Sequence, residues 1–446
     1  MDKKLKVNLS VLGLLWIVPV LIGYGNDLEE TWPAWRGPSG DGHAATSAKP
    51  PVQWNEEKNL RWKIALPGLG NSTPSVLEKQ IVLTAAKPTG RKIEASGKDA
   101  PGKDASGQAR PNEYHALMVV AYDLETGNEK WNTQVTEVVP HEKGHRTSSY
   151  ASASTVTDGQ RIYAFFGSHG LFALDMNGNK LWEREFPKMK TAAGFGEGAS
   201  PALAGNVLVI PWDEEGQSFV AGIDTKSGEQ LWRTDRETGS AWTTPLIVQD
   251  GDRKVAVVSG SAYTRAYDVK DGKEVWHCGG MSSNPTCSPV AAGEVVYVGN
   301  SFRGNVIQAI RFKEAEGDLS ATKNLLWTHK KSASYVPSPV VVDKKLYFLR
   351  SSTGVMGCLD ATTGAVIFPG KRLGLKNVHA SPMVAADRIY VSSREGDTVV
   401  LDLKKECEVL ATNHLEDMFD ASPIAIGDSL ILRGRKNLYR IQAATK

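Results

Sequence analysis

Cysteine is scarce in this sequence. The 446 residues contain four cysteines, Cys278, Cys287, Cys358 and Cys407, and none of them belongs to a CxxC or CxxCH pair. The spacing therefore indicates neither a zinc site nor c-type haem attachment. Cys278 and Cys287 are near enough in sequence for a local disulfide in an oxidising compartment, and buried free thiols are the alternative. In either case disulfides do not staple the fold together.

An excess of charge of either sign is also missing. The chain has 52 Lys and Arg against 50 Asp and Glu, which gives a formal net charge of +2. When residues 1–25 are set aside, 49 basic and 49 acidic residues remain. Such a neutral chain lacks the basic surface that binds nucleic acids or anionic lipids. We therefore expect no nucleic-acid partner.

A long uncharged apolar run occurs at the start of the chain. Lys3 and Lys6 precede the apolar stretch Val11–Ile22, and the small residue Gly23 follows it. This order predicts a signal peptide over residues 1–25 and an exported protein, in the periplasm or outside the cell. The alternative is an uncleaved membrane anchor, since the run is barely long enough to span a bilayer. Membrane contact is expected only through this segment, if it is retained.

Glycine and tryptophan are plentiful, with 43 and 12 residues, and both recur in one turn motif. Its four clear copies read AYDLETGNEKW, ALDMNGNKLW, GIDTKSGEQLW and AYDVKDGKEVW, and they end at Trp131, Trp182, Trp232 and Trp276. Weaker copies occupy residues 358–368 and 400–410, and a stretched copy ends at Trp327. Asp and Thr side chains can bond backbone amides in such turns, and Gly supplies the positive φ of a tight hairpin. The motif therefore predicts repeated β-hairpins.

A second motif marks the start of a strand, as in ASPAL and CSPVA. Its eight copies begin at Ser72, Ala153, Ala199, Thr243, Cys287, Pro337, Ala380 and Ala421. From the third copy onwards the proline of this motif returns every 41 to 50 residues. Each period holds two hairpins, or four strands, which is the length of a propeller blade.

The count of motifs decides how the ring closes. The last unit stops at Lys446 without a final strand, while NLRWKIAL at residues 59–66 places Trp62 in the missing pattern. If the strand at residues 59–66 pairs with the last unit, no sheet edge is left free. The sequence therefore predicts an all-β fold: an eight-bladed β-propeller of four-stranded antiparallel blades, closed by an N-terminal strand that joins the last blade.

The same reading divides the chain into segments. The propeller is expected over residues 59–446, after an N-terminal extension at residues 26–58. Residues 87–113 are rich in Gly, Lys, Ala and Ser and lengthen the first blade. We expect them to form a flexible insertion loop. A lid over the ring is the alternative.

The A-x-D-x-x-T-G-x-x-x-W spacing resembles the repeat of the PQQ-like (quinoprotein-type) β-propeller family. That family includes dehydrogenases that use pyrroloquinoline quinone (PQQ) and non-enzymatic BamB-type assembly factors. WPAWRGPSGDG at residues 32–42 and EVLATNHL at residues 408–415 make the layout look closest to PQQ-like proteins of planctomycete-type bacteria. The resemblance implies that the motif tryptophans dock one blade on the next: Trp62, Trp131, Trp182, Trp232, Trp276 and Trp327.

The resemblance does not by itself imply a cofactor. Dehydrogenases of this family hold the quinone between a tryptophan and a disulfide of adjacent cysteines, with calcium bound by acidic and amide side chains. No two cysteines are adjacent here, and Trp242 is the only tryptophan directly before a strand-start motif. We therefore expect no cofactor and no metal, with PQQ and calcium as the alternative.

The residues just before each strand-start motif are expected to surround one mouth of the central channel. They are Asn71, Tyr150, Glu197, Trp242, Asn284, Tyr335, His379 and Asp420. This mixture of aromatic, amide and charged groups could bind a sugar, a peptide or another small polar ligand. A hydrated polar funnel is the alternative. Glu197 and Asp420 belong to the third and eighth blades, which argues against direct contact between them.

Two further stretches carry possible ligands. His141 and His145 are spaced as in helical zinc sites, but their surroundings predict an exposed or substrate-side loop and no third ligand is evident. His169 and His277 are expected to be turn or surface residues. The acidic run at residues 212–215 could contact calcium, and a solvated hairpin is the simpler explanation.

These observations favour a non-enzymatic, exported and monomeric propeller. It would act as a binding or scaffold module for a protein or cell-envelope ligand. The alternative is a PQQ- and calcium-dependent oxidoreductase that uses the channel mouth.

Overall fold

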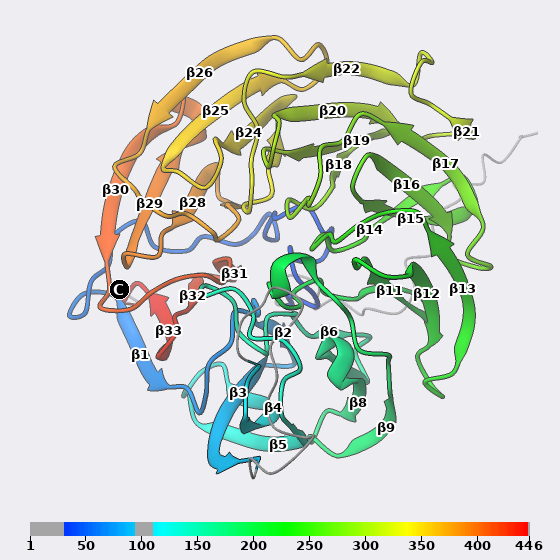
Figure 1. Ribbon diagram of the computed structural model, residues 1–446. Helices are drawn as coiled ribbons and strands as arrows, with labels where there is room; N and C mark the ends of the chain where they lie inside the picture. Colours follow the sequence, from blue (N-terminus) through cyan, green and yellow to red (C-terminus); the bar gives the residue numbers. More distant parts are fainter. Residues whose placement is uncertain (1–30, 94–109, 445–446) are drawn as a thin grey trace, which may run out of the picture.

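The computed structural model describes residues 31–93 and 110–444. The predicted signal peptide at residues 1–25 and residues 94–109 of the predicted insertion loop lie outside this part of the chain. Figure 1 shows eight sheets arranged as a closed ring around a central channel. The predicted eight-bladed, all-β propeller is confirmed. In the described part of the chain three short 3-10 helices interrupt the strands: η3 (Gly167–His169), η4 (Ala192–Gly194) and η5 (Leu403–Lys405).

Each blade begins with a short strand beside the channel and continues outwards in antiparallel order. The first four blades contain β2 (Ser75–Leu77), β3 (Gln80–Lys92), β4 (Glu113–Asp123) and β5 (Glu129–Val138); β6 (Val156–Thr157), β7 (Arg161–Phe165), β8 (Leu171–Asp175) and β9 (Lys180–Arg184); β10 (Ala202–Ala204), β11 (Val207–Trp212), β12 (Ser218–Asp224) and β13 (Gln230–Arg236); and β14 (Leu246–Asp250), β15 (Arg253–Ser259), β16 (Tyr263–Asp268) and β17 (Glu274–Gly279). The last four contain β18 (Val290–Ala292), β19 (Val295–Asn300), β20 (Val306–Arg311) and β22 (Leu325–His329); β23 (Val340–Val342), β24 (Lys345–Leu349), β25 (Val355–Asp360) and β26 (Val366–Arg372); β27 (Met383–Ala385), β28 (Arg388–Ser392), β29 (Asp397–Asp402) and β30 (Glu408–His414); and β31 (Ile424–Ile426), β32 (Ser429–Arg433), β33 (Asn437–Gln442) and β1 (Leu60–Ala65).

The eighth blade closes the ring in the predicted way. Strand β1 pairs antiparallel with β33, and Trp62 lies opposite Arg440. Two buried arginines of this blade then reach the first blade. Arg433 donates to the carbonyl oxygens of Ser72 at 2.8 Å and Thr84 at 2.7 Å, and Arg440 donates to the carbonyl of Leu124 at 3.0 Å. The seam is therefore held by side chains as well as by strand pairing.

Tryptophans of the turn motif contact the following blade. Five of them donate the indole N–H to a backbone carbonyl in the next blade's turn at 2.8–3.1 Å: Trp62, Trp131, Trp182, Trp232 and Trp327. The motif glycine of that turn lies against the indole ring, so closely that an added Cβ would come within 3 Å of it. This contact explains why Gly and Trp recur together in the motif.

Trp276 has a different neighbour, because the next turn is the stretched copy. Within that insertion β21 (Gly317–Asp318) pairs parallel with β17, and Gly317 lies opposite Trp276. The fourth blade thus gains a fifth strand, which the sequence did not predict. Ala315 and Leu319 of the insertion pack in the same apolar cluster and bury the Trp276 ring.

A circle of hydrogen bonds surrounds the channel where the innermost strands begin. In each blade a Ser or Thr hydroxyl accepts the backbone N–H of the corresponding residue in the preceding blade. In order, the N–H donors and hydroxyl acceptors are Thr73 to Ser154 (2.9 Å), Ser154 to Ser200 (2.9 Å), Ser200 to Thr244 (3.0 Å), Thr244 to Ser288 (2.9 Å), Ser288 to Ser338 (2.9 Å), Ser338 to Ser381 (2.9 Å), Ser381 to Ser422 (3.1 Å) and Ser422 to Thr73 (3.1 Å). We call these eight residues the hydroxyl belt.

The N-terminal extension crosses one end of the channel. Trp32 pairs with Val76 of the first blade, and further along, Arg36 donates to the carbonyls of Pro339 at 2.6 Å and Pro382 at 2.8 Å in the sixth and seventh blades. Between these contacts, Trp35 lines both the channel and a shallow outer pocket of about 120 Å³. The segment passes across the centre of the ring in Figure 1 (dark blue). It therefore lies across this end of the channel.

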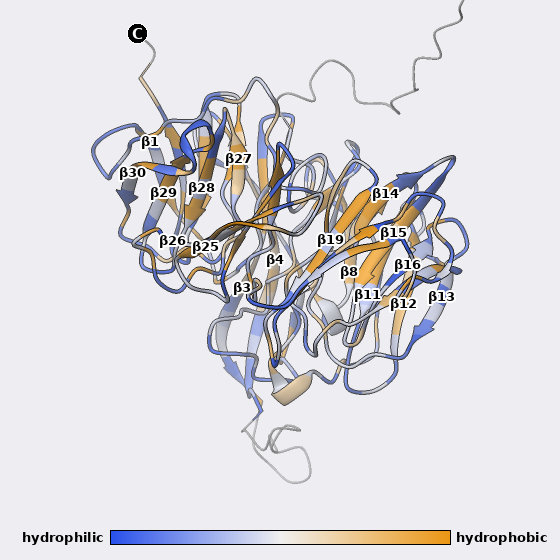
Figure 2. Ribbon diagram, turned by 90° about the horizontal axis from the view of Figure 1, so that it is seen from above, coloured by the Kyte–Doolittle hydropathy of each residue, from blue (hydrophilic) through white to orange (hydrophobic). Residues whose placement is uncertain are grey.

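The first blade carries the longest hairpin, which projects beyond its neighbours in Figure 2. Strand β3 continues through Lys92 and β4 begins at Glu113, so the hairpin takes up the start of the range predicted as a loop. The strand continues because Arg91 pairs with Glu137 and lies over the Tyr114 ring, 3.5 Å from its centroid. No residue between 94 and 109 is described.

Apolar side chains pack between neighbouring blades rather than at the channel. The largest cluster joins the seventh, eighth and first blades with Trp32 and Trp54 of the N-terminal extension. All four cysteines are free and buried, and three of them, Cys278, Cys358 and Cys407, lie in such layers. The structure thus contains no Cys278–Cys287 bridge, and the free thiols are the alternative it supports.

Candidate functional site

The channel holds a cavity that we call the cup, with the N-terminal extension across one end. Its cavity volume is about 510 Å³. Seven of the eight belt residues line it, all except Ser338. Five aromatic side chains also face it: Trp35, Phe195, Trp242, Phe302 and Tyr335. A cavity of this size, with mixed aromatic and polar walls, is suited to a small-molecule ligand or to one end of a larger one.

The predicted mouth residues do not all reach this cup. Six of them line it: Asn71, Glu197, Trp242, Tyr335, His379 and Asp420. Tyr150 instead lines a smaller side pocket, together with Glu197 and Trp242. Asn284 lines neither cavity, and its backbone N–H is bonded to Ser261 Oγ at 3.1 Å. Six of the eight predicted side chains therefore line the cup, and Tyr150 lies in the adjoining side pocket.

Two aromatic pairs stand at the mouth. Phe302 and Tyr335 stack with centroids 5.8 Å apart and planes 18° apart. Phe195 and Trp242 lie 6.3 Å apart with planes inclined by 44°. The indole N–H of Trp242 donates to the Gly196 carbonyl at 2.7 Å, which fixes the ring beside the η4 loop. The mouth therefore presents rigid flat surfaces on two sides.

Asp420 lies on the wall of the cup among cationic groups. Arg394 Nε lies 2.7 Å and His379 Nδ1 3.4 Å from its Oδ1, and Arg435 Nε donates to its Oδ2 at 3.0 Å. Burial alone would raise the pKa of Asp420, but His379 and the two arginines hold it below its usual value. The carboxylate is therefore already paired and has little capacity left for a metal ion.

Glu197 is the other carboxyl of the cup and has the opposite environment. Its Oε2 accepts the Ser168 N–H at 2.6 Å, while His141 Nε2 lies 3.7 Å from Oε1. Burial raises the pKa of Glu197 to about 8, and the nearby carboxylates Glu142 and Glu214 act in the same direction. Glu197 is thus protonated at neutral pH.

Glu197 approaches Ser168 closely because the neighbouring residue is glycine. Gly167 has a φ of +57°, and a Cβ there would overlap the Glu197 carboxyl. No hydrogen bond or ion pair connects Glu197 to Asp420 within residues 31–93 and 110–444. The expectation that these two carboxyls do not meet agrees with this geometry.

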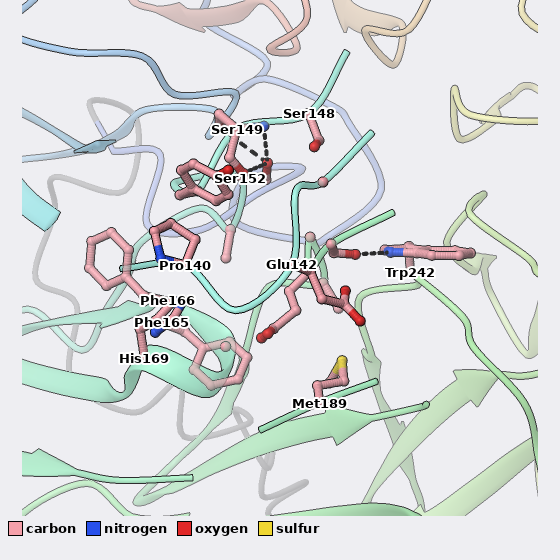
Figure 3. Close-up of a pocket in the computed structure, with 18 of the residues that line it drawn as sticks. Pro140, Glu142, Ser148, Ser149, Ser152, Phe165, Phe166, His169, Met189 and Trp242 are labelled. Carbon is pink, nitrogen blue, oxygen red and sulfur yellow. Dashed lines mark hydrogen bonds between the residues drawn. The ribbon is translucent and has the colours of Figure 1, made fainter. Parts of the chain in front are cut away.

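The side pocket lies behind Glu197 and has a volume of about 50 Å³. Figure 3 shows Trp242 on one side of it and Phe165, Phe166 and His169 on the other, with Met189 below. The His169 ring lies 5.5 Å from His141, and burial lowers the pKa of His169 to about 4. The histidine beside the pocket is therefore neutral at pH 7.

Of the predictions about these stretches, the one for residues 212–215 was wrong. Of the two possibilities for the loop at His141, the structure does not show the exposed one: the His141 side chain is 15% exposed, lines the side pocket and donates from Nε2 to the Met189 carbonyl at 2.7 Å. His169 is a turn residue, since it ends the 3-10 helix η3, and it lines the same pocket. The hairpin at residues 212–215 is not solvated throughout, because Asp213 is buried in an ion pair with Arg236 at 2.7 Å. Burial of the loop after β9 against the cup accounts for the two histidines.

Sequence reasoning missed several residues that shape the cup. The belt hydroxyls were visible as the Ser and Thr of the strand-start motif, but their position on the channel was not deduced. Trp35, Phe195 and Phe302 belong to neither repeated motif, so the repeats did not indicate them. They come from the N-terminal extension and from two loops between strands.

The donor groups of the cup do not fit a calcium-bound quinone. Among the residues that the structure describes, no three His, Cys, Asp or Glu side chains are grouped so as to hold a metal ion. Asp420 is paired with arginines, Glu197 is protonated, and all four cysteines are free and none lines the cup. Trp242 is present at the mouth, but the other partners that the resemblance implies for PQQ are not.

Solved propellers share this architecture. BamB from Moraxella catarrhalis superposes with a TM-score of 0.59 at 14% sequence identity, over 87% of this chain and 98% of that chain. A europium-containing methanol dehydrogenase superposes with a TM-score of 0.62 at 10% identity, over 92% and 90%. At these identities the likeness shows the fold alone.

One protein with a similar sequence is an enzyme subunit. Methanol dehydrogenase (cytochrome c) subunit 1 from Methylobacterium organophilum is 30% identical over 156 residues, which cover 29% of this chain and 23% of that protein. The match thus spans less than a quarter of the relative's length. A match of this length does not show what activity this chain has.

The match to a family is far more extensive. The family described as outer membrane protein assembly factor BamB matches residues 14–210 and 216–446. These ranges include nearly all of every blade and the N-terminal extension that crosses the channel. The chain belongs to this family of PQQ-like β-propellers.

Proposed function

We propose that this protein is an exported, non-enzymatic propeller that binds a protein or other cell-envelope ligand at the open end of its channel. The observation that carries the proposal is the cup. Trp35 of the N-terminal extension lines it, together with two aromatic pairs and many hydroxyls. Such a cavity can hold a ligand group without passing it through the ring.

Export rests on the predicted signal peptide at residues 1–25. Within residues 31–93 and 110–444 no helix is both long and apolar enough to span a membrane. The family description, an outer membrane assembly factor, favours a partner in the cell envelope. The neutral charge balance makes a nucleic acid an unsuitable partner.

The proposal is tested by retention of bacterial envelope components on the immobilised chain. Trp242→Ala removes an aromatic surface of the cup, and Tyr263→Ala removes an exposed aromatic side chain on β16 as a matched control. We expect Trp242→Ala to lower retention of the ligand at least tenfold and Tyr263→Ala to leave it unchanged. Equal retention by both variants would show that the binding site lies elsewhere.

A quinoprotein oxidoreductase is the second candidate, and the match to methanol dehydrogenase subunit 1 favours it. PQQ and calcium are added to the purified chain, and absorbance and thermal unfolding are recorded. We expect no stoichiometric binding, because the calcium donors do not fit. Stoichiometric binding that Trp242→Ala abolishes would overturn the non-enzymatic proposal.

A further inference from the structure

We propose that the cup binds an uncharged N-acetylated sugar, with the sugar ring beside Trp242 and the acetamido group in the side pocket beside Glu197. The inference rests on the proposed function and specifies the ligand class of the same site. Three features of the cup carry it: a wall that is rich in hydroxyls and poor in charge, its aromatic surfaces and the side pocket.

The wall of the cup is rich in hydroxyls and poor in charge. Twelve Ser and Thr residues line it, and no Lys or Arg does. In the belt each hydroxyl oxygen accepts an N–H, so its own hydrogen remains able to donate towards the channel. Of the two carboxyls, Asp420 is paired with arginines and Glu197 is protonated. A polyhydroxylated ligand without net charge matches such a wall.

Aromatic faces complement the apolar faces of sugar rings. Trp242 with Phe195 and Tyr335 with Phe302 stand at the mouth on different blades, so a ring entering the cup meets flat apolar surface on two sides. Hydroxyls then lie deeper, at the belt. Flat apolar surface combined with dense hydrogen-bonding groups distinguishes a sugar from an apolar ligand.

The side pocket matches a small group that is apolar at one end and polar at the other. Its volume of about 50 Å³ is several times the roughly 10–15 Å³ that one water needs. Phe165, Phe166 and Met189 supply apolar walls, and Glu197 and Ser152 supply polar groups. An acetamido group would place its methyl against the apolar walls and its carbonyl beside the polar groups.

Glu197 provides the donor for that carbonyl. Its Oε2 accepts the Ser168 N–H, and Oε1 makes no hydrogen bond within the described residues, so a proton on Oε1 can be shared with a ligand. The charged or titratable groups around it are Glu142, Glu214, His141, His169 and Asp213. Glu142 and Glu214 favour the protonated form, His141 donates its Nε2–H to Met189, His169 is neutral, and Asp213 is paired with Arg236.

The two cavities adjoin at Gly198. Gly198, Glu197, Ser152 and Trp242 line both of them. A Cβ at Gly198 would lie 3.6 Å from Trp242 Cδ1 and 3.8 Å from Ser152 Cβ, which are ordinary contact distances. Alanine therefore fits at this position, whereas the two methyl groups of valine would crowd the space where the cavities adjoin.

The test is titration calorimetry of the full exported chain with N,N′-diacetylchitobiose and with cellobiose, which lacks the acetamido groups. We expect diacetylchitobiose to bind at least tenfold more tightly. Gly198→Val should remove this preference and Gly198→Ala should keep it. Thermal unfolding of each variant shows whether the fold is retained.

The pH dependence provides an independent measurement. In the wild-type chain binding should fall tenfold per pH unit above about pH 8, as Glu197 loses its proton. Glu197→Gln keeps a neutral amide donor, so its binding should persist at pH 7 and stay constant to pH 9. Equal falls in both proteins would overturn the role of Glu197.

Other outcomes separate this inference from the proposed function. Equal affinity for the two disaccharides would overturn the assignment of the side pocket to an acetyl group. Binding of an envelope protein at the cup, without binding of either sugar, would overturn the sugar proposal and leave the proposed function standing. Loss of all ligand binding to the cup would overturn both.

Discussion

The hydroxyl belt and the channel mouth are made by neighbouring residues of the same eight blades, yet they differ in chemistry. In the belt every blade supplies a Ser or Thr that makes the same hydrogen bond. Two to four residues earlier, the blades supply amides, aromatics, carboxyls and a histidine. Repeated positions thus build the ring, and positions that the repeat leaves free determine what the ring can bind. This contrast predicts that belt and seam variants lose stability, whereas mouth variants change binding.

The largest effect is expected where the ring closes. Arg433→Ala removes the donor to the buried carbonyls of Ser72 and Thr84 and leaves a cavity between the eighth and first blades. The free energy of unfolding should fall by about 3 kcal/mol or more. Urea unfolding measures it, with the exposed Arg372→Ala as a control that should change by less than about 0.5 kcal/mol. Equal effects of the two changes would contradict a special role for the seam.

At Glu197, which lies at the channel mouth, a substitution should raise the free energy of unfolding instead of lowering it. Folded Glu197 keeps its proton up to about pH 8, whereas an unfolded glutamate loses it near 4.5, so the stability of the wild-type chain falls as pH rises through that window. Glu197→Gln should raise the free energy of unfolding by about 2 kcal/mol at pH 8 and by little at pH 4. Urea unfolding at both pH values measures the difference. An equal gain at both pH values would show that the buried charge is not the cause.

A single belt hydroxyl should matter less. Ser338→Ala leaves the Ser288 N–H without its acceptor, and we expect a loss of about 1 kcal/mol. Ser338 is the belt residue that does not line the cup. Ser338→Thr retains the hydroxyl and should restore most of the stability. Thermal unfolding compares the three proteins, and ligand retention should be equal in all of them. A loss of retention with unchanged stability would reverse the contrast between belt and mouth.

The smallest effect on stability is expected at Trp242. Trp242→Phe removes the N–H that donates to the Gly196 carbonyl, which water can reach at the open mouth. The free energy of unfolding should change by about 0.5 kcal/mol or less. Ligand retention should nevertheless fall several-fold, because the aromatic face becomes smaller. A large loss of stability would show that Trp242 is part of the scaffold.

The sequence was sufficient to predict the ring of blades but not the residues that line the cup. Gly and Trp return at fixed spacing because each pair makes one contact between blades, so counting them predicted the blade number and the closing strand β1. Trp35 and Phe302 lie on the channel only because segments distant in sequence come together there. The pKa of Glu197 depends on the loops at residues 140–150 and 186–198, which bury it, and no local pattern reveals that burial.

The hydroxyl belt also has an electrical consequence. A helix ends in unpaired N–H and carbonyl groups, and its aligned dipoles leave opposite partial charges at the two ends. The belt has no ends: its eight N–H···O dipoles point the same way round a circle and return to Thr73. Dipoles arranged tangentially in this way cancel on the axis. The N–H···O bonds of the belt therefore set almost no field along the channel axis, and a preference for charge there comes from other groups, such as Asp420 and its arginines.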